Sequence, residues 1–266
     1  MGTVMSADGT PIAYTRHGGA GPTVVLVGGT LMTQFRHDPL AGLLARDFRV
    51  FNYDRRGRGA SGDHPTYDVQ REVDDLNAVI GLAGAPVLLF GMSSGAVLAL
   101  EAVARGSAVS ALALYEPPLV VDASRPPLPS QYVDQLAALL AQDDVDGALH
   151  YFLTEGMALH PKAVDALRNG PAWAAWRDVA RTLPYDGMLM RDLMSGRPLS
   201  PDRWRTVDIP VLVGHGSAGE PHMIEAAGQL TSRDSFTLHT FPGQGHAVDP
   251  HALAPVLTEF FTTYHG

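Results

Sequence analysis

Short runs of apolar, often β-branched residues recur along the chain and alternate with segments of helical periodicity. The clearest are "PTVVLVGG" at 22–29, "PVLLFG" at 86–91 and "IPVLVGHG" at 209–216. A strand that is apolar at every position is buried on both faces, as in parallel sheets whose crossover helices cover both sides. The spacing therefore predicts an α/β protein with a mostly parallel central sheet flanked by helices.

Other segments extend this pattern. Further strands are predicted at 48–54, 110–116 and 235–241, and helices near 69–83, 94–105 and 251–264. The Asp8-Gly9 pair in "ADGTPIAY" is a turn signal between two short extended segments. It predicts a hairpin at the N-terminal end.

Residues 118–206 interrupt the alternation. They begin with the proline-rich "PLVVDASRPPLP" and continue with helical patterns only, such as "YVDQLAALLAQDD" and "AWAAWRDVARTL". Ligands of open α/β sheets bind beyond the carboxyl ends of the strands, which is where an insertion between two core strands would lie. We expect an α/β core of residues 1–117 and 207–266, with a helical cap of residues 118–206 inserted between core strands.

Composition and charge exclude several function classes. Of 266 residues, 45% are hydrophobic and 18% charged, as in an ordinary soluble domain with a substantial core. The net charge of −9, with a densest basic run of only six residues ("DRRGRG"), disfavours a nucleic-acid partner. The chain has no cysteine, no signal-peptide pattern and no membrane-length apolar stretch. We expect a cytoplasmic protein whose partner is a small-molecule substrate rather than a membrane; oligomeric state is left open.

Neither a cofactor nor a metal is expected. The first buried strand leads into "GGTLMT", which differs from the Gly-x-Gly-x-x-Gly pattern of dinucleotide sites. His215, His222 and His251 lack the spacing of a compact ligand set. "DRRGRG" at 54–59 is interpreted as a structural turn, in which Asp54 and the arginines hold neighbouring loops.

The stretch "GMSSG" at 91–95 places Ser93 between a buried strand and a helix. This context favours a nucleophile on a sharp turn, with the helix N-terminus directed at an anion above it, over a simple small-residue turn. A serine nucleophile needs a neighbouring base. His246 follows the last strand through "PGQG" and precedes the final helix, so it can hang over the carboxyl edge of the sheet.

The motifs, in this order, resemble the α/β-hydrolase fold family over essentially the full length of the chain. The segments that carry the resemblance are "GGT" (28–30), "YDRRGRGASG" (53–62), "GMSSG" (91–95), "YEPP" (115–118) and "GQGH" (243–246). The resemblance implies acyl chemistry by Ser93 and His246, with a carboxylate as the third group, which orients the imidazole. It also implies an oxyanion hole built from backbone N–H groups of Thr30 and Ser94, although this chain has Gly-Gly where the family often has His-Gly.

The orienting acid departs from the family pattern. In the commonest arrangement it follows the "PVLV" strand, at a position that aligns here with Gly219. Three substitutes are available: Glu116 at the end of the strand after the nucleophile helix, Glu220 beside the usual position, and Asp249 close after the histidine. We favour Glu116, because "YEPP" places it at the edge of the sheet; Glu220 and Asp249 have alternative roles at helix starts. A site without any acid also remains open.

The predicted cap supplies candidate pocket residues. These are Met32 near the oxyanion loop, and Tyr132, Trp173, Trp176 and Tyr185. They indicate a mainly apolar pocket, and no arginine clamp for a free carboxylate is evident.

We therefore predict a serine hydrolase that cleaves a small ester, lactone or thioester through an acyl-Ser93 intermediate. One alternative is a non-hydrolytic lyase, cyclase or C–C bond-cleaving enzyme of secondary metabolism that uses His246 as general base. The other is a non-catalytic ligand-binding protein.

Overall fold

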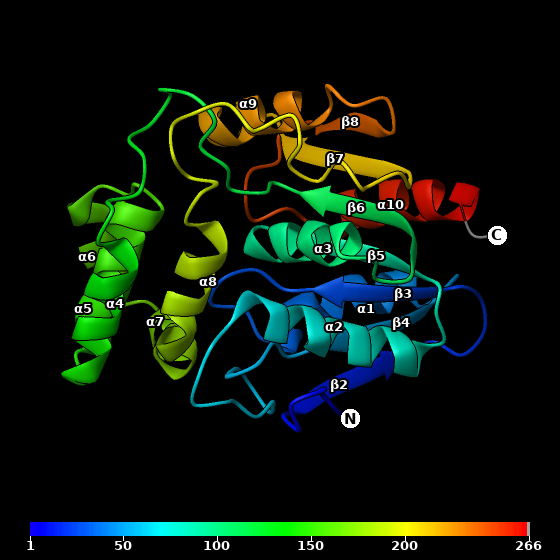
Figure 1. The fold of residues 1–266 in the computed structure, drawn as a ribbon, viewed down its shortest axis with the longest axis horizontal. Coiled ribbons are helices and arrows are strands. Elements are labelled where there is room, and N and C mark those ends of the chain that lie inside the picture. The colour runs from blue at the N-terminus through cyan, green and yellow to red at the C-terminus, as the bar shows by residue number, and fades with distance from the viewer. Residues whose placement is uncertain (265–266) are drawn as a thin grey trace.

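An eight-stranded sheet forms the centre of the computed structural model, which describes residues 1–264 (Figure 1). The strand order is β1-β2-β4-β3-β5-β6-β7-β8, parallel from β4 to β8 and antiparallel where β2 meets β1 and β4. The strands are β1 Gly2–Met5, β2 Pro11–His17, β3 Thr23–Val27, β4 Arg49–Tyr53, β5 Val87–Met92, β6 Val109–Tyr115, β7 Val211–Gly216 and β8 Phe236–Phe241. The predicted fold class and the N-terminal hairpin are confirmed.

The central strands bury both faces, as their uniform hydrophobicity predicts. In β3, Val25 and Val27 join the apolar cluster on one face, and Val24 and Leu26 join the cluster on the other. Side chains alternate along a strand, so each such run feeds two cores at once. The helices that complete the two cores must therefore lie on opposite sides of the sheet.

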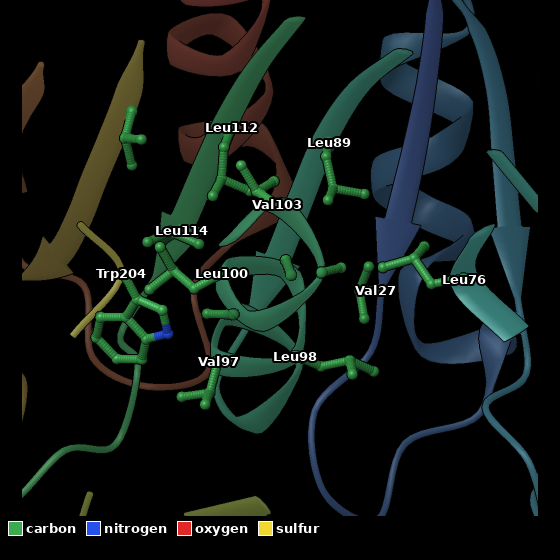
Figure 2. Close-up of a cluster of buried hydrophobic side chains, with 14 of the residues drawn as sticks. Val27, Leu76, Leu89, Val97, Leu98, Leu100, Val103, Leu112, Leu114 and Trp204 are labelled. Atoms are coloured by element: carbon green, nitrogen blue, oxygen red, sulfur yellow. The ribbon is translucent and has the colours of Figure 1, made fainter. Parts of the chain in front are cut away.

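Five helices cover the sheet. One face is covered by α2 (Val69–Ala83), α3 (Ser94–Ala104) and α9 (Pro221–Leu230), and the other by α1 (Asp38–Leu44) and α10 (Pro250–Tyr264). Figure 2 shows α3 at the centre of the first face, where Val97, Leu98 and Leu100 contact side chains from several strands and Trp204. The α3 residues from Ser94 to Val103 are all buried, so this helix is held against the sheet along its length. This packing fixes the position of Ser93, which directly precedes the helix.

A helical insertion, residues 118–206, lies between β6 and β7. Figure 1 shows its helices beyond the carboxyl ends of the strands, with α8 nearest the sheet. The helices are α4 Tyr132–Ala141, α5 Val145–Tyr151, α6 Pro161–Arg168, α7 Pro171–Val179 and α8 Leu183–Met190, with a short π segment, Phe152–Gly156, and a short 3-10 segment, Ala180–Thr182, among them. A further 3-10 segment, Gln34–His37, precedes α1. The insertion has its own buried apolar cluster, which includes Leu136, Leu149 and Leu183. The division into core and cap domains stays a prediction.

Within residues 1–264, no helix combines the length and the apolar character needed to span a bilayer.

Candidate active site

Ser93 occupies a sharp turn between β5 and α3. Its backbone has φ 55° and ψ −128°, a left-handed conformation that L-residues rarely adopt. The two motif glycines are required by close backbone contacts: a Cβ at Gly91 would lie 2.5 Å from the Gly95 carbonyl oxygen, and a Cβ at Gly95 would lie 2.5 Å from that of Val27. The Ser93 N–H donates to the Tyr115 carbonyl at 2.9 Å. The turn is therefore anchored to the neighbouring strand, and Ser93 lies at the edge of the sheet.

Ser93, His246 and Glu116 form one hydrogen-bonded chain. His246 Nε2 lies 3.2 Å from Ser93 Oγ, and His246 Nδ1 lies 2.8 Å from Glu116 Oε2. The second carboxylate oxygen of Glu116 accepts the Gly216 N–H at 2.9 Å. Glu116 is fully buried, and both of its oxygens have hydrogen-bond donors, as buried carboxylates require. These two contacts set its orientation.

The Glu116 carboxylate occupies the space that a side chain at position 219, the usual acid position, would enter. A Cβ at Gly219 would collide with Glu116 Oε1, so the glycine there makes room for this carboxylate. Glu116 itself has φ 44° and donates its N–H to the Gly214 carbonyl at 2.9 Å. Of the other candidates, Asp249 accepts the His251 N–H at 2.9 Å at the start of α10, and Glu220 is exposed before α9. The geometry thus pairs Glu116, and neither alternative, with the histidine.

The two residues of the predicted oxyanion hole lie side by side. Thr30 follows β3 and Ser94 is the first residue of α3; the Thr30 hydroxyl donates to Ser94 Oγ at 3.0 Å. A Cβ at Gly29 would lie 2.8 Å from the Ser93 Cβ, so this position of the Gly-Gly pair permits only glycine beside the serine. The N–H of Ser94 belongs to the first turn of a helix, where backbone donors lack intrahelical acceptors.

The "DRRGRG" turn is built from buried ion pairs, in agreement with its structural interpretation. Asp54 accepts the Gln34 N–H at 2.7 Å and the Ala60 N–H at 3.0 Å. Arg55 is paired with Glu72 through two hydrogen bonds, of 2.8 and 2.6 Å. The turn therefore ties together the loops that surround Ser93.

A cavity of about 460 Å³ lies between the insertion and the edge of the sheet. Ser93, Ser94, Thr30 and His246 line it, so the hydrogen-bonded chain opens into this space. Of the five predicted pocket residues, Met32, Tyr132 and Trp176 line the cavity.

Trp173 and Tyr185 are absent from the lining. Trp173 is buried in the cluster of the insertion, where its indole N–H donates to Asp146 at 2.8 Å. The Tyr185 hydroxyl donates to Asp63 at 2.8 Å, and its ring stacks on Tyr67 with centroids 4.1 Å apart. The prediction of these two residues as pocket residues is corrected accordingly.

Methionines form a large part of the apolar wall of the cavity. Six of the nine in the sequence line it: Met32, Met92, Met157, Met190, Met194 and Met223. Their positions are scattered over core and insertion, so no single segment of the sequence predicts this wall. The flexible thioether side chain fits irregular apolar ligands, so the wall can adapt to ligand shape.

The cavity also contains polar groups that the sequence analysis missed. Arg36 and Arg125 line it, although no arginine clamp was evident in the sequence. Arg125 donates to the carbonyls of Glu155 and Gly156 at 2.8 and 2.9 Å, which fixes its guanidinium to the insertion. His222 also lines the cavity; burial, with a contribution from the Arg125 charge, lowers its pKa to about 4. Its position shortly after the end of β7 was the only sequence signal that could have placed it near the site.

No group of three or more His, Cys, Asp or Glu side chains in the described part of the chain could hold a metal ion.

Comparison with known proteins gives consistent results. The model of the alpha/beta hydrolase family matches residues 19–256. The structure of an α/β hydrolase from Sphaerobacter thermophilus is 46% identical, with 98% of this chain and 100% of that chain covered and a TM-score of 0.91. A non-heme chloroperoxidase from Streptomyces lividans is 27% identical over 98% of this chain and 99% of its own length.

More distant structures share the fold. An enol-lactonase from Burkholderia xenovorans has a TM-score of 0.73 at 20% identity, with 98% of this chain and 100% of that chain covered. The match of the family model over most of the chain and the 46% identical hydrolase structure support a hydrolase-type enzyme. The chain belongs to the α/β hydrolase family.

Proposed function

We propose that the protein is a serine hydrolase that cleaves a small, mainly apolar ester, lactone or thioester through an acyl-Ser93 intermediate. The observation that carries this proposal is the continuous chain from Ser93 through His246 to buried Glu116, which opens into an apolar cavity. A nucleophile, a base and an orienting acid in this order are the arrangement that activates serine.

In the proposed mechanism, His246 carries its proton on Nδ1, and this N–H donates a hydrogen bond to the Glu116 carboxylate. This leaves Nε2 free to accept the Ser93 proton as Oγ attacks the substrate carbonyl. The backbone N–H groups of Thr30 and Ser94 stabilise the tetrahedral oxyanion, assisted by the α3 N-terminus. His246 then returns the proton to the leaving oxygen or sulfur, and water, activated by the same imidazole, releases the acid from Ser93.

The proposed substrate class rests on the cavity. Its volume of about 460 Å³ falls within the usual range for small-molecule sites, and its wall is largely apolar. The imidazole of His222 is neutral near pH 7, since its pKa is lowered to about 4, so it can act as a hydrogen-bonding group rather than a charge. A compact acyl group of irregular shape suits this lining best.

The test is labelling with a fluorophosphonate, followed by intact mass measurement and peptide mapping, together with turnover of short-chain p-nitrophenyl esters and thioesters. We expect one label per chain, at Ser93, and loss of both labelling and turnover in Ser93→Ala and His246→Gln. Ser107→Ala is the matched control, because Ser107 lies beyond α3 and its hydroxyl donates to Asn77. A folded wild-type protein that is neither labelled nor active on any ester would overturn the proposal and favour general-base chemistry by His246.

A further inference from the structure

The Gly29–Thr30 peptide has one side in the proposed oxyanion hole and the other side in a buried ion-pair cluster. Arg58 Nη1 donates to the Gly29 carbonyl oxygen at 2.6 Å. The C=O and N–H of a trans peptide lie in one plane and point in opposite directions. An acceptor bond that fixes the Gly29 carbonyl therefore also fixes the direction of the Thr30 N–H.

Arg58 is held in turn by the helical insertion. Its Nη2 donates to Asp186 Oδ2 at 2.6 Å, and its Nε donates to Thr182 Oγ1 at 3.1 Å. The turn approaches the insertion so closely that a Cβ at Gly57 would lie 2.8 Å from the Thr182 methyl group. The guanidinium thus joins α8 and the segment before it to the loop that carries Thr30.

The second oxyanion residue is tied to the same cluster. Arg55 Nη1 donates to Asp186 Oδ1 at 2.9 Å and to the Ser94 hydroxyl at 3.1 Å. Asp186 therefore connects, through two different arginines, to both residues whose N–H groups face a developing oxyanion.

The cluster is buried and balanced in charge, with Asp186 at the wall of the cavity. Arg55 and Arg58 supply two positive charges, and Glu72 and Asp186 supply two negative ones; all four are buried. Burial by itself raises the pKa of Asp186, but the adjacent arginine charges hold that pKa below its usual value. Removing one member of such a cluster leaves another charge buried without its partner.

We propose that Arg58 is a positioning residue that aims and polarises the Gly29–Thr30 peptide, and that it does so only while Asp186 of the insertion holds it. This inference rests on the proposed function. The oxyanion hole is then assembled by the seating of α8 on the core, so the helix that walls the cavity also controls transition-state stabilisation. A guanidinium on the carbonyl also draws electron density through the peptide and makes the Thr30 N–H a stronger donor.

Arg58→Lys is the principal variant, because lysine keeps the charge but cannot span the Gly29 carbonyl and Asp186 together. Arg56→Lys is the matched control. Arg56 belongs to the same turn, is equally buried, and forms two 2.7 Å hydrogen bonds with Asp75, on the side away from the oxyanion loop. Both variants lose hydrogen bonds of a buried, ion-paired guanidinium, so both should lower Tm.

The measurements are kcat and KM for an ester, and the affinity for an arylboronic acid, which forms a tetrahedral adduct on the serine. Loss of one oxyanion donor costs about 10²–10³ in kcat. Misaiming it in Arg58→Lys should lower kcat about 10- to 100-fold, leave KM within about twofold and weaken boronate binding by the same factor as kcat. Arg56→Lys should keep kcat and boronate affinity within about threefold of wild type.

Thr182→Val is a milder variant, since it leaves the bonds of Arg58 to Asp186 and Gly29 in place and removes the acceptor of Arg58 Nε, together with a hydrogen bond from the Thr182 hydroxyl to the Val179 carbonyl. We expect a roughly two- to fivefold loss of kcat with a matching loss of boronate affinity. Arg58→Lys with unchanged kcat, a kcat loss without loss of boronate affinity, or equal kcat losses in Arg58→Lys and Arg56→Lys would each overturn the inference. In all three cases an active, labelled wild-type protein leaves the proposed hydrolase function standing. An inactive and unlabelled wild type removes both.

Discussion

Moving the acid from position 116 to position 219 tests how the site is built. The carboxylate of Glu116 fills the space that a side chain at Gly219 would enter, so the two positions are alternative sources of one carboxylate. The double variant Glu116→Gly, Gly219→Asp empties the first position and fills the second. Glycine also suits the φ of 44° at position 116, so the backbone there needs no rearrangement.

The magnitude follows from the lost contact. Glu116 accepts the His246 Nδ1 proton at 2.8 Å; without it, the imidazole loses its required tautomer and the stabilisation of its charged form. Removing this acceptor from a serine-protease triad costs about 10⁴ in kcat, which corresponds to about 5 kcal/mol. We expect Glu116→Gly alone to lose about that much. The double variant should recover about 10², because a new carboxylate misplaced by roughly 1 Å still costs about 10².

The assay is ester hydrolysis in a full double-mutant cycle, with the rate of fluorophosphonate labelling as a second readout. Gly219→Asp alone should be destabilised in urea unfolding, because its side chain collides with Glu116 and brings two carboxylates together. The reasoning is refuted if the double variant is folded but no more active than Glu116→Gly. Wild-type activity in Glu116→Gly would show that His246 works without this acid.

Three further predictions concern single positions. Burial, with a smaller effect of Arg36, lowers the pKa of His37 to about 4. Between about pH 6.5 and 4 the unfolded chain therefore binds more protons than the folded protein, so the free energy of unfolding decreases as the pH is lowered. His37→Gln should remove up to about 3 kcal/mol of that decrease in urea titrations. A slope that is unchanged in the variant would contradict this. Gly95→Ala should cost about 2 kcal/mol or more because its Cβ meets the core strand, whereas Gly81→Ala, with open space around its Cβ in α2, should gain up to about 1 kcal/mol. Trp176→Ala should raise KM for bulky acyl esters several-fold with little loss of Tm, while Trp173→Ala should lower Tm by several degrees with KM unchanged; the reverse assignment of effects would show that the cavity wall is misplaced.

Local patterns were sufficient for the parts of the fold that depend on one segment at a time. The uniform apolar runs predicted β3, β5 and β7, and "GMSSG" between a strand and a helix predicted the turn at Ser93. Glu116 was reached indirectly, from its place at the end of β6 and the glycine at 219. Its left-handed backbone has no signal in the sequence, because a glutamate does not favour that conformation.

The wall of the cavity could not be predicted in the same way. Trp173 and Trp176 lie three residues apart on α7, and hydrophobicity does not distinguish the one that packs inside the insertion from the one that faces the cavity. That choice depends on how five helices pack together. The ion pair between Arg58 and Asp186 spans 128 residues of sequence. The sequence predicted that the arginines of "DRRGRG" hold neighbouring loops, but nothing in it identified Asp186 as a partner.

Neighbouring residues of α8 line the cavity and take part in the buried ion-pair cluster. Asp186, Gly187 and Met190 line the cavity, and Asp186 also accepts hydrogen bonds from Arg55 and Arg58. A substitution at Met190 changes the shape of the wall and leaves the buried charges in place, so it can alter substrate choice without affecting the Ser93 chemistry. A substitution at Asp186 leaves two guanidinium groups without their shared carboxylate. Under the proposed function, a change at Met190 can therefore alter substrate preference alone, whereas a change at Asp186 alters the cavity wall and the buried ion pairs together.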